Sequence, residues 1–231
     1  MSARLSIVVP VLDEGAALHG FLEHLQPLRA RGHELICVDG GSRDGCVRGV
    51  EPLVDRLLET GPGRARQMNA GAAVAAGEVL LFLHADTRLP PGADRLVAAA
   101  VGGGHPWGRF DVRLSGSQWP LRWIERAMSL RSRLSGIATG DQALFVRRDV
   151  FDRVGGYADI ALMEDLDLCR RLRRLAPPAC LRQRVITSSR RWERDGILRT
   201  ILLMWALRLA WSVGVPPRRL ARIYYPAREF P

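Results

Sequence analysis

The sequence predicts an α/β protein with a mostly parallel β-sheet flanked by helices and a C-terminal helical extension. Short, β-branched apolar runs alternate with segments of helical spacing, as in βαβ units with right-handed crossovers. Each run ends in a polar or glycine-containing cluster, and open α/β sheets bind ligands at such strand ends. Of the 231 residues, 47% are hydrophobic and 25% charged, which suits a globular protein with a substantial core.

The first elements are two buried strands separated by a helix. Leu5–Val9 is a β-branched run that ends at Pro10, a pattern typical of a buried parallel strand. Apolar residues then recur at helical spacing from Leu18 to Leu28. Glu34–Val38 is the second strand, and it ends in the sequence DGGSRDG.

The middle of the chain continues the alternation. Val47–Glu59 predicts a helix, and Gly61-Pro62-Gly63 interrupts the chain after it. An alanine-rich helix over Arg64–Ala76 leads into the third strand, Val79–Leu83. Arg95–Val101 is expected to be helical, because Pro91 stands near its start.

The second half is less regular. It predicts strands in GRFDVRL and QALFVRR, an amphipathic helix over Trp119–Leu134 and another helix over Met163–Leu175. Cys180–Ser189 is expected to be an edge strand. We predict one continuous domain over residues 1–190 and a helical extension over residues 191–231.

The extension contains the longest apolar stretch, Ile197–Val215, which Arg199 and Arg208 interrupt. These charges argue against a membrane-spanning helix and leave an interfacial helix open. Nine residues apart, they lie on roughly opposite sides of a helix that turns about 100° per residue. We expect the extension to pack on the domain, on a partner subunit of a homodimer or on a membrane surface, and we favour burial in a dimer or bundle.

The formal net charge is +10, and every basic residue is an arginine. Because arginine binds phosphate bidentately, the charge predicts anionic partners: sugar nucleotides, nucleic acid or an anionic membrane surface. The four cysteines show neither zinc-ligand nor C-x-x-C spacing, and the N-terminus carries no signal-peptide pattern. We therefore expect a cytoplasmic location, with peripheral contact at the inner face of the membrane left open.

Polar clusters at the strand ends are the candidate binding residues. Asp39, before two glycines, is placed to accept hydrogen bonds from a base or ribose, or to form an Asx turn without a ligand. Arg64 and Arg66 open a helix, a natural site for a diphosphate, although solvated surface arginines are common there. No G-x-G-x-x-G or P-loop pattern occurs, which disfavours the familiar dinucleotide and NTPase sites.

Two further clusters carry reactive side chains. His84 and Asp86 follow the third strand. This pattern suits two metal ligands, one metal ligand with a neighbour, or a polar turn without a metal. Glu164 and Asp165 begin a helix, where the macrodipole alone favours acids, but a carboxylate there also suits a general base. The segment Gly140-Asp141-Gln142 precedes a strand and is a weaker candidate for acceptor contacts.

At these residues the sequence resembles the family-2 glycosyltransferases of the Rossmann-like GT-A fold. The resemblance runs from Leu5 to about Leu175 and rests on five motifs in the family's order: VVPVLDEG, VDGGSRDG, NAGAAVAAGEVLLFLHADT, GDQALFVRRDVFDRVGGY and MEDLDLCRRL. More narrowly, GRARQMNAGA, FLHADTRLP, GRFDVRL and the tail RRWERDGILRTILLMWALRLAW resemble a small bacterial subgroup of glycosyltransferase-like transferases, some associated with arsenosugar biosynthesis.

The resemblance implies transfer of a sugar, with inversion, from a nucleoside-diphosphate sugar of the UDP or GDP type to a hydroxyl acceptor. It implies Asp165 as general base beside Glu164, and Asp86 as the metal-binding acid with Mn²⁺ or Mg²⁺ on the diphosphate. Apart from the resemblance, the position of Gly140, Asp141 and Gln142 before a strand makes them the expected contacts of an acceptor, lipid-linked or small. The implied nucleotide-binding residues are Pro10, Val11, Glu14, Asp39, Gly41, Arg64, Arg66, Asn69, Ala85 and Asp86.

Two positions depart from the family's pattern. Gly40 follows Asp39 where many members have a second acid. His84 stands in place of the first acid of the family's metal-binding motif D-x-D, whose final acid is Asp86. If His84 binds metal, its softer imidazole favours Mn²⁺ over Mg²⁺; otherwise it faces away, since alternate strand residues point to opposite faces.

Two other functions remain as alternatives. A sugar-nucleotide-forming nucleotidyltransferase would want a glycine-rich phosphate loop after the first strand, and PVLDEGAALHG has none. A non-catalytic protein of anionic surfaces or nucleic acid fits the +10 charge but not the carboxylates at successive strand ends, so no nucleic-acid partner is expected.

Overall fold

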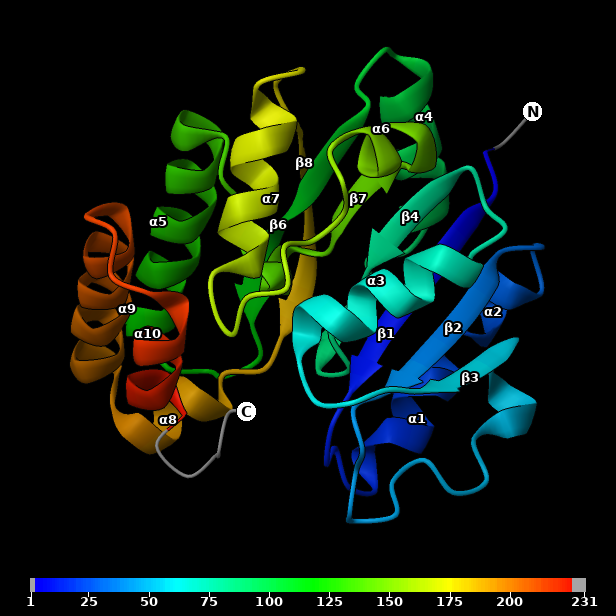
Figure 1. Cartoon of the computed structure of the whole chain (residues 1–231), viewed down its shortest axis with the longest axis horizontal. Coiled ribbons are helices and arrows are strands. Elements are labelled where there is room, and N and C mark those ends of the chain that lie inside the picture. Colours follow the sequence, from blue (N-terminus) through cyan, green and yellow to red (C-terminus); the bar gives the residue numbers. More distant parts are fainter. Residues whose placement is uncertain (1–2, 226–231) are drawn as a thin grey trace.

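The computed structural model describes residues 3–225, which form an eight-stranded sheet of order β3-β2-β1-β4-β7-β6-β8-β5 (Figure 1). β7 and β5 run antiparallel to their neighbours and the other six strands share one direction, so the predicted mostly parallel sheet is confirmed. The strands are β1 Leu5–Val11, β2 Glu34–Asp39, β3 Arg56–Glu59, β4 Val79–Phe82, β5 Thr87–Arg88, β6 Trp107–Leu114, β7 Leu144–Arg147 and β8 Ala179–Thr187.

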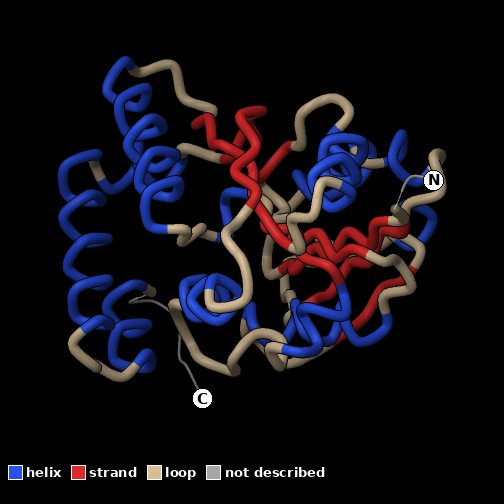
Figure 2. The backbone as a smooth tube through the Cα atoms, turned by 90° about the horizontal axis from the view of Figure 1, so that it is seen from above, coloured by secondary structure: helices blue, strands red, loops and turns tan. Residues whose placement is uncertain are grey.

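Helices cover both faces of this sheet, as Figure 2 shows from a second direction. Their bounds are α1 Ala17–His24, α2 Gln26–Arg29, α3 Arg64–Val74, α4 Ala93–Gly102, α5 Trp119–Ser135, α6 Arg148–Arg153, α7 Glu164–Arg173, α8 Arg190–Asp195, α9 Ile197–Ser212 and α10 Pro217–Tyr224. Two 3₁₀ turns, η1 Glu51–Leu53 and η2 Gly140–Gln142, complete the described elements.

Alternation along the strands divides the core between the two faces. Ile7 and Val9 of β1 pack in one cluster with α1, α2 and α4, whereas Val8 packs in another with α3, α6 and α7. α3 approaches the sheet so closely that a Cβ at Gly71 would lie 2.4 Å from Cγ1 of Val8. This close packing holds the start of α3 beside the carboxyl end of β1.

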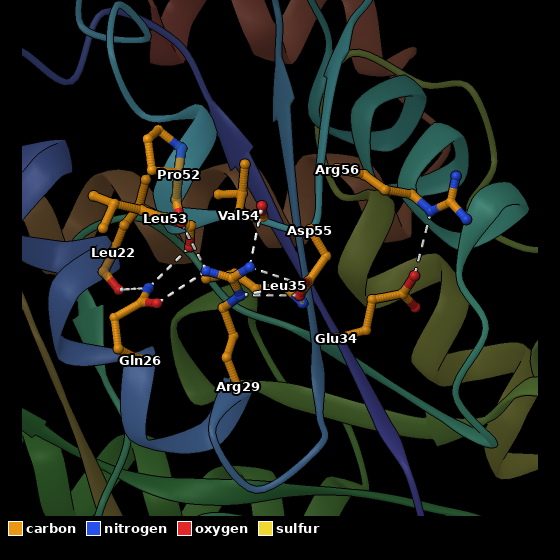
Figure 3. A network of polar contacts seen from close by, with 10 residues as sticks. All are labelled: Leu22, Gln26, Arg29, Glu34, Leu35, Pro52, Leu53, Val54, Asp55 and Arg56. Carbon is orange, nitrogen blue, oxygen red and sulfur yellow. Dashed lines mark hydrogen bonds and ion pairs between the residues drawn. The ribbon is translucent and has the colours of Figure 1, made fainter.

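The helix predicted over Val47–Glu59 is wrong. Only η1 is helical there, and β3 pairs in parallel with β2 at the edge of the sheet. Asp55 anchors the segment between η1 and β3. Its carboxylate accepts a 2.7 Å hydrogen bond from the Leu35 N–H and forms an ion pair with Arg29 (Figure 3). Pro52 also disfavours a continuous helix, so tertiary pairing overrides the apolar spacing.

The strand predicted at Cys180–Ser189 forms, but it does not end the sheet. Thr87 and Arg88 of β5 pair with Thr187 and Ile186 of β8 on its outer side. The loop after β4 therefore crosses to the far side of β8 within a few residues. A strand of only two residues, such as β5, shows too little periodicity to be predicted from the sequence.

The C-terminal extension packs on α7 and α5. Leu207 of α9 and Leu220 of α10 share a buried cluster with Leu166 of α7, and Ile201 packs with Ile124 of α5. No helix among the described residues is long and apolar enough to span a bilayer. The boundary at residue 190 stays a prediction, and residues 226–231 of the predicted extension lie outside the described part.

Candidate active site

Two adjoining cavities open at the carboxyl ends of β1 and β4. The first has a volume of about 290 Å³ and is lined by the β1 end, the start of α3, the β4 end and the loop before α7. The second, of about 410 Å³, is lined by η2, the start of α7 and the facing sides of α5 and α9. Both cavities are lined by Arg64, His84, Asp86 and Glu164.

Most predicted nucleotide-binding residues line the first cavity. Besides the residues common to both cavities, these are Pro10, Val11, Glu14, Arg66 and Ala85. Gln67, outside the predicted set, donates hydrogen bonds of 2.7 and 2.9 Å to the carbonyls of Val11 and Val38. It thereby ties the ends of β1 and β2 to α3 and fixes this wall of the cavity.

Asp39, Gly41 and Asn69 do not line either cavity. The Asp39 carboxylate accepts hydrogen bonds from the Ser42 hydroxyl, at 2.6 Å, and from the Ser42 N–H. Asn69 exchanges hydrogen bonds with the backbone of Tyr157. Asp39 therefore builds the polar turn that the sequence left as the alternative, and a nucleotide contact by these three residues stays a prediction.

The two arginines that open α3 differ in their surroundings. Arg64 lines both cavities, whereas Arg66 lines only the first and pairs with Asp159 at 3.4 Å. Gly63 precedes them with a φ of 140°, and the first free amide N–H groups of α3 follow. A helix start with two arginines is suited to an anion such as a diphosphate.

His84 lies against Gly140 of η2. A Cβ at Gly140 would be 2.5 Å from both Cε1 and Nε2 of the imidazole, so a larger residue there would force the ring or the η2 turn to shift. Burial and the charge of Arg64 lower the pKa of His84 to about 3, and the ring is neutral at neutral pH. The edge of the ring that carries Nε2 thus borders the predicted acceptor segment.

A left-handed turn places Glu164 and Asp165 at the start of α7. Met163, the preceding residue, has a φ of 71°, which is strained for a side chain other than glycine. Asp165 accepts hydrogen bonds from the N–H groups of Gly140, at 2.8 Å, and Leu166, at 2.7 Å. Asp165 lines only the second cavity, whereas Glu164 lines both.

Desolvation perturbs both of these carboxyl groups. Burial and the adjacent Asp165 raise the pKa of Glu164 to about 7. Burial also raises the pKa of Asp165, although the two backbone N–H groups oppose the shift. A carboxylate whose pKa is raised is a stronger base than one in water, which suits proton abstraction.

The predicted acceptor residues are only partly in the second cavity. Gly140 and Asp141 line it, whereas Gln142 is buried and forms a capping box with Thr139. Burial raises the pKa of Asp141, and burial and Arg208 lower the pKa of Arg131 to about 10. Oδ1 of Asp141 and Nη2 of Arg131 are buried without a hydrogen-bond partner among the described residues, as in a site that a ligand completes.

A metal ion would have few protein ligands here. Among residues 3–225 no group of three or more His, Cys, Asp and Glu side chains is arranged to hold a cation. Asp86 is exposed to both cavities, and neutral His84 stands two residues before it. This set fits a cation that takes one or two protein ligands and completes its shell with phosphate oxygens and water.

Sequence reasoning missed several residues of the first cavity. Arg218 and Tyr225, from α10 and the residue after it, line it beside Asp159 and Ile160. No local motif marks Arg218 or Tyr225, because packing of the extension alone brings them to the strand ends. Gln67 had a local signal, a polar residue on the sheet-facing side of an alanine-rich helix.

Comparison with known proteins bears on the family and the fold. Residues 6–155 match the family model described as glycosyl transferase family 2. A PGL/p-HBAD biosynthesis glycosyltransferase of Mycobacterium bovis is 33% identical over 166 residues, which are 66% of this chain and 62% of that protein. The chain thus spans less than two thirds of that relative, and Glu164 and Asp165 lie beyond the family match.

Solved structures support the fold. The mannosyltransferase PcManGT from Pyrobaculum calidifontis, in complex with GDP-Man and Mn²⁺, superposes with a TM-score of 0.63 at 20% identity, over 91% of this chain and 61% of that one. S. aureus TarS 1-349 in complex with UDP-GlcNAc gives 0.62 at 16% identity, over 80% of this chain and 58% of that one. These likenesses confirm the GT-A fold expected from the motifs.

Proposed function

Because this chain belongs to glycosyl transferase family 2, we propose that it transfers a sugar from a nucleoside-diphosphate sugar to a hydroxyl acceptor, with inversion. The carrying observation is that two cavities meet at Arg64, His84, Asp86 and Glu164. A transfer reaction needs donor and acceptor sites that meet at the reacting carbon, and the common residues supply that meeting point.

The first cavity takes the donor. The ends of β1 and β4 line one side of it, and Arg64 and Arg66 line it at the start of α3, where the diphosphate would lie. Arginine forks and helix N–H groups bind the diphosphate in the ground state and stabilise its growing charge as it leaves. The complexes of PcManGT with GDP-Man and of TarS with UDP-GlcNAc support a donor of this class.

The second cavity takes the acceptor, and Asp165 is the general base. As the acceptor oxygen attacks the anomeric carbon, the bond from that carbon to the diphosphate oxygen breaks, and the hydroxyl proton passes to Asp165. The N–H groups of Gly140 and Leu166 orient the carboxylate for this role. Attack opposite the leaving group inverts the anomeric centre, and no covalent enzyme intermediate is needed.

Asp86 would hold a divalent cation, Mn²⁺ or Mg²⁺. When bound, the ion supplies Lewis-acid neutralisation of the departing diphosphate. His84, whose ring borders Gly140, is the second candidate ligand beside it. The Mn²⁺ in the PcManGT complex supports a metal at the corresponding step.

A thermal-shift screen tests the proposal directly. UDP, GDP and their sugar conjugates are added with and without Mn²⁺ or Mg²⁺, and we expect one nucleotide to raise Tm more with metal than alone. Incubation of that donor with candidate alcohols, followed by NMR of the product, then reads the anomeric configuration. Stabilisation by nucleoside triphosphates alone, or a product that retains configuration, would contradict the assignment.

A further inference from the structure

The neighbouring helices α5 and α9 carry exposed apolar stripes that no described residue covers. On α9 and the residue that caps it the stripe consists of Leu198, Leu202, Trp205, Leu209 and Val213, which are 61–73% exposed. On α5 it consists of Trp119, Trp123, Leu130 and Leu134, which are 57–80% exposed. Steps of three, four or seven residues put each set on one side of its helix.

These stripes are not the surfaces by which the two helices join the fold. Ile124 and Met128 of α5 pack against Ile197 and Ile201 of α9, in a separate cluster with Leu121. Figure 1 shows the two helices side by side at the end of the molecule away from β3. A soluble surface seldom carries so many large exposed apolar side chains on two adjoining helices unless they bind something.

The positive charge of the protein is concentrated in the same region. Residues 119–135 and 190–224 contain twelve arginines and three acids, and so hold nine of the ten net positive charges. The remainder of the chain is nearly neutral, with 22 arginines and 21 acids. Arg126, Arg199, Arg219 and Arg222 are exposed on α5, α9 and α10.

We propose that α5 and the α9–α10 extension dock on the surface of a bilayer that contains anionic lipids. Leucine and tryptophan stripes enter the interface between headgroups and acyl chains, while flanking arginines attract the anionic headgroups. A second copy of this chain would set one strongly basic surface against another, which disfavours a dimer through this face. Nucleic acid would satisfy the arginines but leave the apolar stripes in water.

The second cavity opens toward this docking surface. Ile201, Met204 and Trp205 of α9 line it opposite Ile124 and Met128 of α5, and Trp205 is 70% exposed. Docking needs no catalysis, but if the proposed function holds, a hydroxyl acceptor held in the membrane reaches Asp165 between these helices. A membrane-held amphiphile is then the acceptor class, and this assignment alone rests on the proposed function.

Vesicle co-sedimentation of the full chain tests docking without any substrate. We expect the protein to sediment with phosphatidylcholine vesicles that contain phosphatidylglycerol, and not with phosphatidylcholine alone. Leu202→Asp with Leu209→Asp should weaken binding at least tenfold, because each substitution puts a charge in the stripe that enters the interface. Arg199→Gln with Arg222→Gln should weaken it about fivefold for each arginine removed.

Leu175→Asp is the matched control, since Leu175 is 48% exposed but lies two residues after α7, outside both stripes, and its binding should equal that of the parent. If the double aspartate variant fails to fold, quenching of Trp205 by brominated lipid, compared with Trp205→Phe, replaces it. Equal binding to neutral vesicles, no binding to either, or parent-like binding by the double variant would overturn docking. Docking would also be overturned if the parent protein were a dimer and the double aspartate variant a monomer. Failure of donor binding in the thermal-shift screen, with docking intact, would remove only the acceptor assignment.

Discussion

The imidazole of His84 fills the space that a side chain at Gly140 would need. A Cβ there would lie 2.5 Å from both Nε2 and Cε1, and the N–H of the same glycine donates to Asp165 at 2.8 Å. The end of β4, the η2 turn and the start of α7 are thereby coupled through one residue. Position 84 thus bears on the orientation of the proposed base as well as on metal binding.

Gly140→Ala should lower turnover by at least tenfold, because the new methyl group displaces either His84 or the N–H that orients Asp165. Steady-state kinetics of transfer give kcat and KM. His84→Ala in the same chain should restore part of the loss by freeing the space. Gly20→Ala is the control: nothing lies within 4 Å of its added Cβ, and alanine favours the α1 helix. Full activity of Gly140→Ala would show that the contact has no role in positioning.

Asp165→Asn should reduce kcat by about 10²–10⁴-fold, the usual contribution of a general base, with nucleotide binding nearly unchanged. Single-turnover kinetics and titration with the nucleoside diphosphate separate the two effects. Asp167→Asn is matched to it, because Asp167 lies two residues further along α7 and pairs with Arg171 instead. Turnover near that of the parent would assign the base to another residue.

Glu164→Gln should stabilise the fold at pH 8 and change it little at pH 4. The folded protein holds the Glu164 proton with a pKa of about 7, above its ordinary 4.5, so the folded state binds more protons between these values. Its stability therefore falls as pH rises through this window, by on the order of 3 kcal/mol. Chemical denaturation at the two pH values measures the difference, and an equal effect at both would show that Glu164 is not held protonated.

Arg64→Gln should raise the Kd for the nucleoside diphosphate about tenfold or more, since a hydrogen bond to a charged group contributes about 1.5–3 kcal/mol. Isothermal titration with the nucleotide identified in the screen provides the value. Arg95→Gln removes one arginine from α4, outside both cavities, and controls for net charge. Equal weakening by both variants would reduce the effect of Arg64 to general electrostatics.

Asp86→Asn should increase the Mn²⁺ or Mg²⁺ concentration that half-saturates the nucleotide-dependent rise in Tm. The carboxylate is the only Asp or Glu side chain of the β4–β5 turn and faces both cavities. His84→Ala compared at the same metal concentrations shows whether the imidazole also contributes. A parent-like metal response in both variants would remove this turn as the metal site.

Much of the fold followed from local patterns. The apolar runs that begin at Leu5 and Val79 form β1 and β4, as predicted. Both are central strands, with a neighbouring strand on each side, which agrees with their continuous apolar character. Val47–Glu59 failed for the opposite reason: its spacing suits a helix, but Pro52 and the Asp55 anchor to Leu35 favour an edge strand. Motif matching also selected Arg64, Asp86 and Glu164 as candidates, and all three line both cavities. They meet because the ligand site of such a sheet lies at the carboxyl ends of its strands.

Periodicity and short motifs are local properties of the chain, and they were enough to predict the mostly parallel sheet, the family resemblance and the polar residues at the strand ends. Which of these polar residues face a cavity depends on tertiary packing. Asp39 turns to Ser42, His84 lies against Gly140, and Arg218 reaches the first cavity from the C-terminal extension. Such contacts join residues far apart in sequence, and their geometry depends on how helices pack on the sheet, which no local pattern encodes.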